Sequence, residues 1–243
     1  MLLPLTRGSA ARVAALMLGL VMTACTGEGS ASEAASAAPG SEPPRASASV
    51  SPAESTEAPA SATGEGALCA VGHETCPLEA GTYTAAPFEP NFAFTIDDGW
   101  TNDRAFADGG GISQESGGIY WASGVEAGRI GEEDIEIGAS TDDFVIFLRG
   151  FEAVGMSVSE PTPITVDGVS GQQVDVESNE AEAPGLYQIA EDSFNLVPGE
   201  KARFLVLDKG GETVILIIDA FASDDFDDWV ETAQPVLDSI SWK

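Results

Sequence analysis

The chain has 243 residues, of which 40 are acidic and 10 are basic, and its formal charge at pH 7 is −30. Nucleic-acid affinity comes largely from Lys and Arg side chains that neutralise phosphates, so this composition excludes nucleic-acid binding. Two interpretations of the acidity stay open. A solubilising surface is favoured because the acids are spread along the chain; a surface that attracts cations is the alternative.

The first 25 residues have the parts of an export signal. Arg7 and Arg12 give a positive start, and a short apolar run over residues 13–23 follows them. This run is too short to cross a bilayer as a stable helix, which takes about 20 residues. The segment therefore indicates export rather than a membrane span.

The end of this signal, Met22-Thr23-Ala24-Cys25, resembles a bacterial lipobox, although Met22 stands where leucine is usual. We therefore predict that residues 1–24 are a lipoprotein signal peptide and that Cys25 carries the lipid. An ordinary signal peptide that is cut nearby is the alternative. The two or more acyl chains that this motif implies would hold the protein stably on the membrane, whereas one chain holds only marginally.

Residues 25–66 are predicted to be the lipidated cysteine and a disordered linker. After Cys25 the segment is almost entirely Ala, Ser, Pro, Glu, Gly and Thr, without an aromatic residue. It cannot bury enough apolar surface to offset the entropy of ordering. Residues 67–243 are then one acidic domain, with 34 acids and 7 bases. The linker would let this domain reach about 35 Å from the anchor.

Cys69 and Cys76 remain as an even pair once Cys25 carries lipid. Outside the cytoplasm such a pair favours a disulfide, which would close a short ring at the start of the domain. The alternative is a metal site formed by both thiolates with His73 and either Glu74 or Glu79. We favour the disulfide, because the spacing is not that of a common zinc module.

The first half of the domain contains two predicted strands, residues 92–96 and 118–122, and a helix over residues 141–153. The helix has Ser140 or Thr141 as its cap, acids in its first turn, and a stripe of aromatic and aliphatic residues. Between the strands, the run Gly109-Gly110-Gly111 does not open a helix. We predict a flexible loop there rather than a phosphate cradle.

The second half turns to strands. One hairpin is predicted from residues 162–166 and 171–176, with an Asp-Gly turn at Asp167-Gly168. A second hairpin joins residues 201–207 and 212–220, and its second strand is apolar almost throughout, so it should be covered on both faces. A closing helix capped at Ser223 follows. The last predicted strand covers residues 239–242.

These elements predict an α+β fold, a mostly antiparallel β-sheet with helices packed on it. The stretches 92–100, 141–148, 160–176, 198–219 and 226–242 resemble an actinobacterial family of small secreted lipoproteins of unknown function. The closing helix and the sequence Leu237-Asp238-Ser239-Ile240 resemble the PsbP/LpqN-type α/β sandwich. The resemblance implies this fold and a location in the cell envelope. It implies no active-site residue, because its motifs are those of packing and turns.

No catalytic signature is present. The chain lacks a G-x-S-x-G elbow, an H-E-x-x-H motif, a P-loop and a dinucleotide fingerprint. Its one histidine, His73, lies close to the linker. The acidic runs lack the alternation and the glycine of a calcium loop. We therefore predict a protein that is not an enzyme and that has neither cofactor nor metal.

Three aromatic residues, Trp100, Tyr120 and Trp121, lie next to glycine-rich segments and are the candidate ligand contacts; the alternative is that they belong to the core. The leading hypothesis is a non-catalytic binding or accessory module, anchored by lipid on the outer face of the cytoplasmic membrane. Its partner would be a small molecule, a lipid or an envelope protein. The alternatives are an envelope hydrolase that uses carboxylates and a purely structural surface protein.

Overall fold

The structure, a computed structural model, describes residues 65–68, 75–179, 186–188 and 193–243. The chain divides into two units, Met1–Ser55 and Thr56–Lys243, and every described residue belongs to the second. The predicted signal peptide, Cys25 and the linker up to residue 64 lie outside the described residues, as do Cys69 and His73. Among the helices that are described, none is long and apolar enough to cross a membrane.

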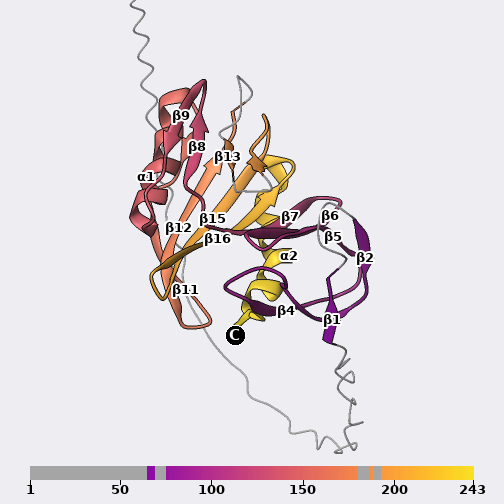
Figure 1. Cartoon of the computed structure of the whole chain (residues 1–243). Helices are drawn as coiled ribbons and strands as arrows, with labels where there is room; N and C mark the ends of the chain where they lie inside the picture. The colour runs from indigo at the N-terminus through magenta and orange to yellow at the C-terminus, as the bar shows by residue number, and fades with distance from the viewer. Residues whose placement is uncertain (1–64, 69–74, 180–185, 189–192) are drawn as a thin grey trace, which may run out of the picture. The chain divides into compact units, whose positions relative to one another are not determined.

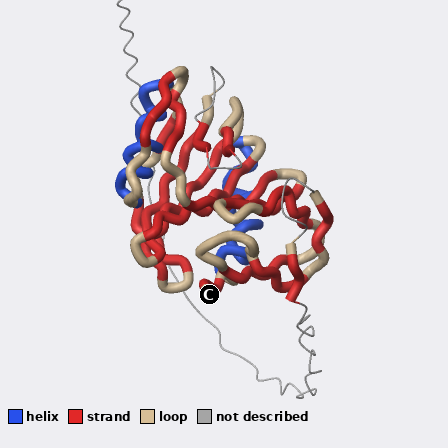
Figure 2. Tube along the Cα trace, in the orientation of Figure 1, coloured by secondary structure: helices blue, strands red, loops and turns tan. Residues whose placement is uncertain are grey.

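Most of the described elements are strands, and two α-helices accompany them (Figure 2). This confirms the predicted α+β class, and all the pairings are antiparallel except that of β1 with β3. The largest sheet, which we call the central sheet, has the order β10 (Ser157–Val158), β12 (Val169–Glu177), β15 (Lys201–Lys209), β16 (Glu212–Ala220), β7 (Gly117–Ser123), β6 (Gly109–Gln114), β5 (Trp100–Ala105) and β2 (Cys76–Leu78), and β11 (Thr162–Val166) also pairs with β12.

Two smaller sheets accompany the central sheet. The terminal sheet has the order β1 (Glu65–Ala67), β3 (Gly81–Thr84), β4 (Phe92–Ile96) and β17 (Ser241–Trp242). The small sheet has the order β14 (Ser193–Asn195), β13 (Leu186–Gln188), β8 (Ala127–Ile130) and β9 (Glu133–Glu136). The terminal sheet therefore pairs strands from the beginning and the end of the described chain.

Buried residues cover both faces of the central sheet. Along β16, Leu216 and Ile218 belong to one core cluster, together with the terminal sheet and α2 (Phe226–Asp238). Ile215 and Ile217 belong to the other cluster, together with α1 (Thr141–Gly150) and parts of the small sheet. The two helices thus lie against opposite faces (Figure 1). The prediction that this apolar strand is covered on both faces is confirmed.

Both predicted hairpin turns are present. β11 and β12 are joined through Asp167 and Gly168, whose φ angles are 44° and 78°. The second hairpin was predicted to turn over residues 208–211, but the strands continue to Lys209 and Glu212. Only Gly210 and Gly211 form the turn, again with positive φ. Two-residue turns with positive φ match the natural twist of paired strands, which explains why this hairpin closes so tightly.

The predicted helix over residues 141–153 is divided into α1 and a short 3₁₀ helix, Phe151–Val154. The Ser140 side chain accepts a hydrogen bond from the Asp143 backbone amide, and Asp143 accepts one from the Ser140 amide. This reciprocal capping satisfies two amide groups that have no partner inside the helix. It identifies Ser140, rather than Thr141, as the cap.

The predicted cap of the last helix is wrong. Ser223 begins a short 3₁₀ helix, Ser223–Asp225, and its amide donates to the Gly199 carbonyl 2.8 Å away. The α-helix begins only at Phe226, and it has no side-chain cap. The bond to the neighbouring loop holds Ser223 outside the helix. Pro235 lies inside α2 and does not interrupt it.

The prediction of a flexible loop at Gly109-Gly110-Gly111 is also wrong, because these glycines begin strand β6. A Cβ atom at Gly110 would meet the Trp121 indole at 2.6 Å. A Cβ atom at Gly111 would clash with the Tyr120 ring. The glycines therefore leave space on both faces of the strand for aromatic rings from neighbouring β7. Their role is close packing and not flexibility.

Candidate binding pocket

The three aromatic residues that the sequence singled out are buried and do not surround one cleft. Trp100 and Trp121 are each 3% exposed and lie in the core cluster that includes α2. Tyr120 is 8% exposed and lies in the cluster on the other face of the central sheet. The Trp100 ring packs against Trp229, with centroids 5.7 Å apart, and the Trp121 ring packs against Phe92 and Phe94.

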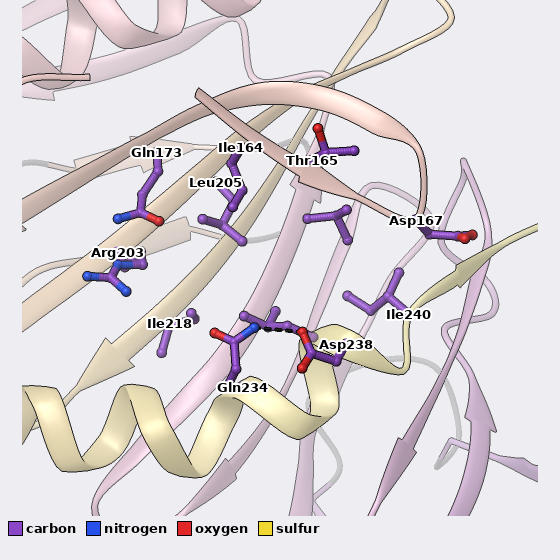
Figure 3. A pocket seen from close by; sticks show the side chains of 12 residues that line it. Ile164, Thr165, Asp167, Gln173, Arg203, Leu205, Ile218, Gln234, Asp238 and Ile240 are labelled. Atoms are coloured by element: carbon purple, nitrogen blue, oxygen red, sulfur yellow. Dashed lines mark hydrogen bonds between the residues drawn. The ribbon is translucent and has the colours of Figure 1, made fainter. Parts of the chain in front are cut away.

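A pocket of about 300 Å³ lies elsewhere, between strands β11, β12 and β15 and the C-terminal half of α2 (Figure 3). The side chains that line it and are largely buried are apolar: Val166, Leu205, Ile218, Leu237 and Ile240. Ile164 adds a partly exposed apolar wall. On one side of the pocket α2 contacts β16 and β4, and on the other side the β11–β12 hairpin supplies lining residues.

Polar side chains form the rim, and Arg203 lies at one end beside Gln173 (Figure 3). The Arg203 guanidinium donates two hydrogen bonds to Asp175, each 2.8 Å long. It also lies 5.4 Å from the centre of the Phe226 ring. The hydrogen bond to Asp175 raises the pKa of Arg203, and the charge of Asp227 adds to this effect. Arg203 is therefore a fixed cation whose charge is balanced by its partner.

The rest of the rim carries carboxylates. On α2, the Gln234 amide donates to Asp238 Oδ1 over 2.7 Å (Figure 3). In the hairpin turn, Asp167 Oδ2 accepts a hydrogen bond from the Trp242 amide at 2.9 Å. The Trp242 indole donates to the Val166 carbonyl at 3.1 Å, which ties β17 to the pocket wall. Among the described residues, neither Asp167 nor Asp238 forms an ion pair.

Two polar residues, Asp219 and Tyr120, are buried on the opposite face of the central sheet, and the partly exposed Glu200 and Arg104 act on their pKa values. Asp219 is 4% exposed, and its Oδ1 atom has no hydrogen-bond partner among the described residues. Burial, reinforced by the charge of Glu200, raises the pKa of Asp219 to about 8. Burial also raises the pKa values of Glu200 and Tyr120. The Arg104 guanidinium lies 4.9 Å from the Tyr120 ring centre.

This buried group is not reached from the pocket. Asp219 is not among the residues that line the pocket of Figure 3. A neutral carboxylic acid at physiological pH can act as a general acid, but only within hydrogen-bond reach of a substrate.

The described residues contain no group of three or more His, Cys, Asp or Glu side chains that could hold a metal ion.

Sequence reasoning missed the pocket, although one signal was present. Arg203, Leu205 and Leu207 alternate along β15, and so they share one face of the strand. A charge on a face that is otherwise apolar indicates either a buried ion pair or a site. The positions of Gln234 and Asp238 against that face depend on how α2 packs, which the alternation does not specify.

No family model matches the chain, and no curated protein matches it. Among solved structures, the chain is similar to the solution structure of cyanobacterial PsbP (CyanoP) from Synechocystis sp. PCC 6803, at a TM-score of 0.37 and 11% sequence identity. The match covers 73% of this chain and 98% of the cyanobacterial chain. A TM-score of this size does not define a shared fold. The α+β class therefore rests on the strands and helices of this chain.

Proposed function

We propose that the protein is a lipid-anchored, non-catalytic module of the cell envelope that binds a small molecule in the pocket between β11, β12, β15 and α2. One observation carries the proposal: an apolar floor is combined with a few polar side chains that converge on the rim. This combination is typical of small-molecule sites, and a volume of about 300 Å³ lies at the lower end of their range. The helices on opposite faces of the central sheet also suit the proposed PsbP/LpqN-type sandwich.

Binding at the pocket is tested by blocking it. Native mass spectrometry of the chain purified from its own host should show a bound small molecule. Gln234→Trp places an indole at the mouth of the pocket and should abolish this adduct. Glu231→Trp is the matched control, because Glu231 is exposed on the same helix and does not line the pocket. An adduct that survives Gln234→Trp would place the ligand elsewhere.

The lipid anchor is proposed from the lipobox-like sequence that ends at Cys25. Cys25→Ser should release the protein from the membrane fraction into the medium, or leave it unprocessed. Fractionation followed by intact-mass measurement distinguishes these states from the lipidated form. A variant that is processed normally and stays in the membrane fraction would contradict lipidation at Cys25.

A disulfide between Cys69 and Cys76 is also proposed, from the even count of the remaining cysteines. Cys76 is the first residue of β2, whereas Cys69 lies outside the described residues. Reduction should increase the mass by about two daltons, because each sulfur gains one hydrogen atom, with the electrons supplied by the added reductant. If both thiols react in the unfolded, metal-free protein without reduction, the metal site with His73 becomes the better hypothesis.

A carboxylate-dependent hydrolase is the second candidate, and the raised pKa of Asp219 is the observation that favours it. Burial keeps this carboxyl neutral at pH 7, which a general acid requires. Hydrolysis of a panel of ester and glycoside substrates that Asp219→Asn abolishes would establish this candidate. The binding module remains the better-supported function, because the described pocket reaches Arg203 and Asp238 and not Asp219.

A further inference from the structure

Taking the proposed pocket as the binding site, we infer that its ligand is an organic cation with an apolar body and an ammonium group. The charges on the rim carry this inference. Arg203, Asp167 and Asp238 are the charged residues that line the pocket, and Arg203 is already balanced by Asp175. The two remaining carboxylates therefore give the rim a net negative charge.

Three effects disfavour an anionic ligand at this site. It would have to share the Arg203 guanidinium with Asp175, which already occupies Nε and Nη2. Asp227 lies close enough to Arg203 to raise its pKa, so this end of the pocket carries further negative charge. The chain as a whole has a formal charge of −30, whose field repels anions and concentrates cations at the surface.

A cationic ligand finds a partner at the other end. Gln234 occupies Oδ1 of Asp238, and no hydrogen bond to Oδ2 is found among the described residues. Asp238 is exposed, so an ammonium group beside it keeps part of its hydration and avoids most of the cost of burying a charge. Lys209 lies over the Trp242 ring, 5.5 Å from its centre, and forms no ion pair with Asp167 or Asp238 among the described residues.

The apolar floor of the pocket determines that the body of the ligand is apolar. Leu205, Ile218 and Leu237 are almost fully buried and present aliphatic carbon to the cavity. A ring or short alkyl group that rests on this floor gains affinity mainly by covering the partly exposed Ile164 side chain, because the floor residues themselves have almost no surface left in contact with water. Compact inorganic cations cannot make this contact, so the pocket selects an organic cation over a metal ion.

Three probes of similar shape and different charge test the inference: phenethylammonium, phenethyl alcohol and hydrocinnamate. Each is titrated into the full chain while NMR follows the side-chain amides of Gln173 and Gln234, which lie on the rim. We expect phenethylammonium to bind about tenfold more tightly than hydrocinnamate. Each carboxylate at a partly exposed rim changes affinity by about two- to fivefold, and it acts in opposite directions on the two probes. Added salt should reduce the difference.

Variants separate a specific contact from the general field of the protein. Asp238→Asn should weaken phenethylammonium binding about two- to fivefold and leave phenethyl alcohol unchanged. Glu231→Gln removes the same charge from an exposed position of the same helix, away from the pocket, and should have a smaller effect. Equal effects of the two variants would overturn the contact with Asp238.

The remaining outcomes distinguish the inference from the proposed function. If phenethyl alcohol or hydrocinnamate binds at the same amides as tightly as phenethylammonium, the pocket is a binding site but the ligand class is wrong. If none of the three probes shifts the amides of Gln173 and Gln234, the proposed binding function itself fails.

Discussion

Arg203 and Asp175 are paired across neighbouring strands β15 and β12, and two parallel hydrogen bonds of 2.8 Å join them. Both side chains are only about one-fifth exposed, at 21% and 19%. Such a two-pronged contact fixes the orientation of the guanidinium as well as its charge. The pair therefore sets the charge that a ligand meets at this end of the pocket.

Asp175→Asn should change the preference of the pocket for charged ligands. The variant leaves the Arg203 charge unbalanced, so phenethylammonium should bind more weakly and hydrocinnamate more tightly. The free energy of unfolding should fall by about 1.5–3 kcal/mol, the usual size for hydrogen bonds to charged groups. Denaturant titration and NMR titration measure the two effects.

The control for this variant is Glu177→Gln, two residues along the same strand. It removes an equal charge without touching Arg203, so the ratio of the two affinities should change less. If the ratio stays constant in Asp175→Asn, the pair does not control the charge of the pocket.

Gly111→Ala should destabilise the protein, because the new Cβ atom would clash with the Tyr120 ring. Tyr120 is packed against Phe194 and Arg104, and so it has little room to move. Overpacking of this kind usually costs about 1–3 kcal/mol. Gln114→Ala, at the end of the same strand, should cost less than half of that amount. Thermal unfolding of the two variants gives the comparison, and equal losses would contradict the close packing.

The same glycines show which features of the fold can be predicted from the sequence and which cannot. The apolar patterns of β4, β15 and β16 depend only on neighbours along the chain, and those strands were predicted within about two residues. Three successive glycines have no such pattern. They pair with β7, whose Trp121 and Tyr120 rings lie against Gly110 and Gly111, and that contact is set by the sheet order.

The candidate sites, too, can be predicted from the sequence only in part. The alternation of β16 already places Asp219 on a covered face of the sheet, beside Ile217 two residues away. The two causes of its raised pKa, however, do not follow from the sequence of β16. They are burial under other parts of the chain and the charge of Glu200, which precedes β15. The pocket likewise combines a hairpin with a helix some sixty residues later in the chain. Sequence patterns predict the faces, and the tertiary packing brings them together.

Asp219 should make the protein less stable as the pH rises. In the unfolded chain this carboxyl loses its proton near pH 4, whereas in the folded protein its pKa is about 8. Between these values the folded state binds more protons than the unfolded state. The contribution of Asp219 to stability therefore falls by up to about 1.4 kcal/mol for each pH unit across this window and is constant above it.

Asp219→Asn tests this contribution, because asparagine resembles the neutral acid and does not titrate. The variant should gain stability over the wild type as the pH rises from about 5 to 8, and the gain should level off above about 8. Urea titrations of both proteins across this range measure it. A constant difference between the two proteins at every pH would show that the pKa of Asp219 is not raised.

Trp121→Ala tests whether the aromatic residues beside the glycines belong to the core or contact a ligand. The Trp121 ring lies 5.5 Å from the centre of Phe92 and 5.7 Å from that of Phe94, and the residue is 3% exposed. Truncation should lower the free energy of unfolding by about 3–5 kcal/mol. Trp100→Ala should have a loss of similar size, because that ring packs against Trp229. Denaturant titration measures both.

The matching binding measurement completes this test. Neither ring lines the pocket of Figure 3, so the affinity for phenethylammonium should be unchanged in any variant that remains folded. A loss of 3–5 kcal/mol is a large fraction of the 5–15 kcal/mol that stabilises a typical domain. Trp121→Phe, which keeps an apolar ring, therefore serves as the folded variant for this measurement. If it binds phenethylammonium much more weakly while its stability is close to that of the wild type, Trp121 contacts the ligand and the pocket is not the binding site.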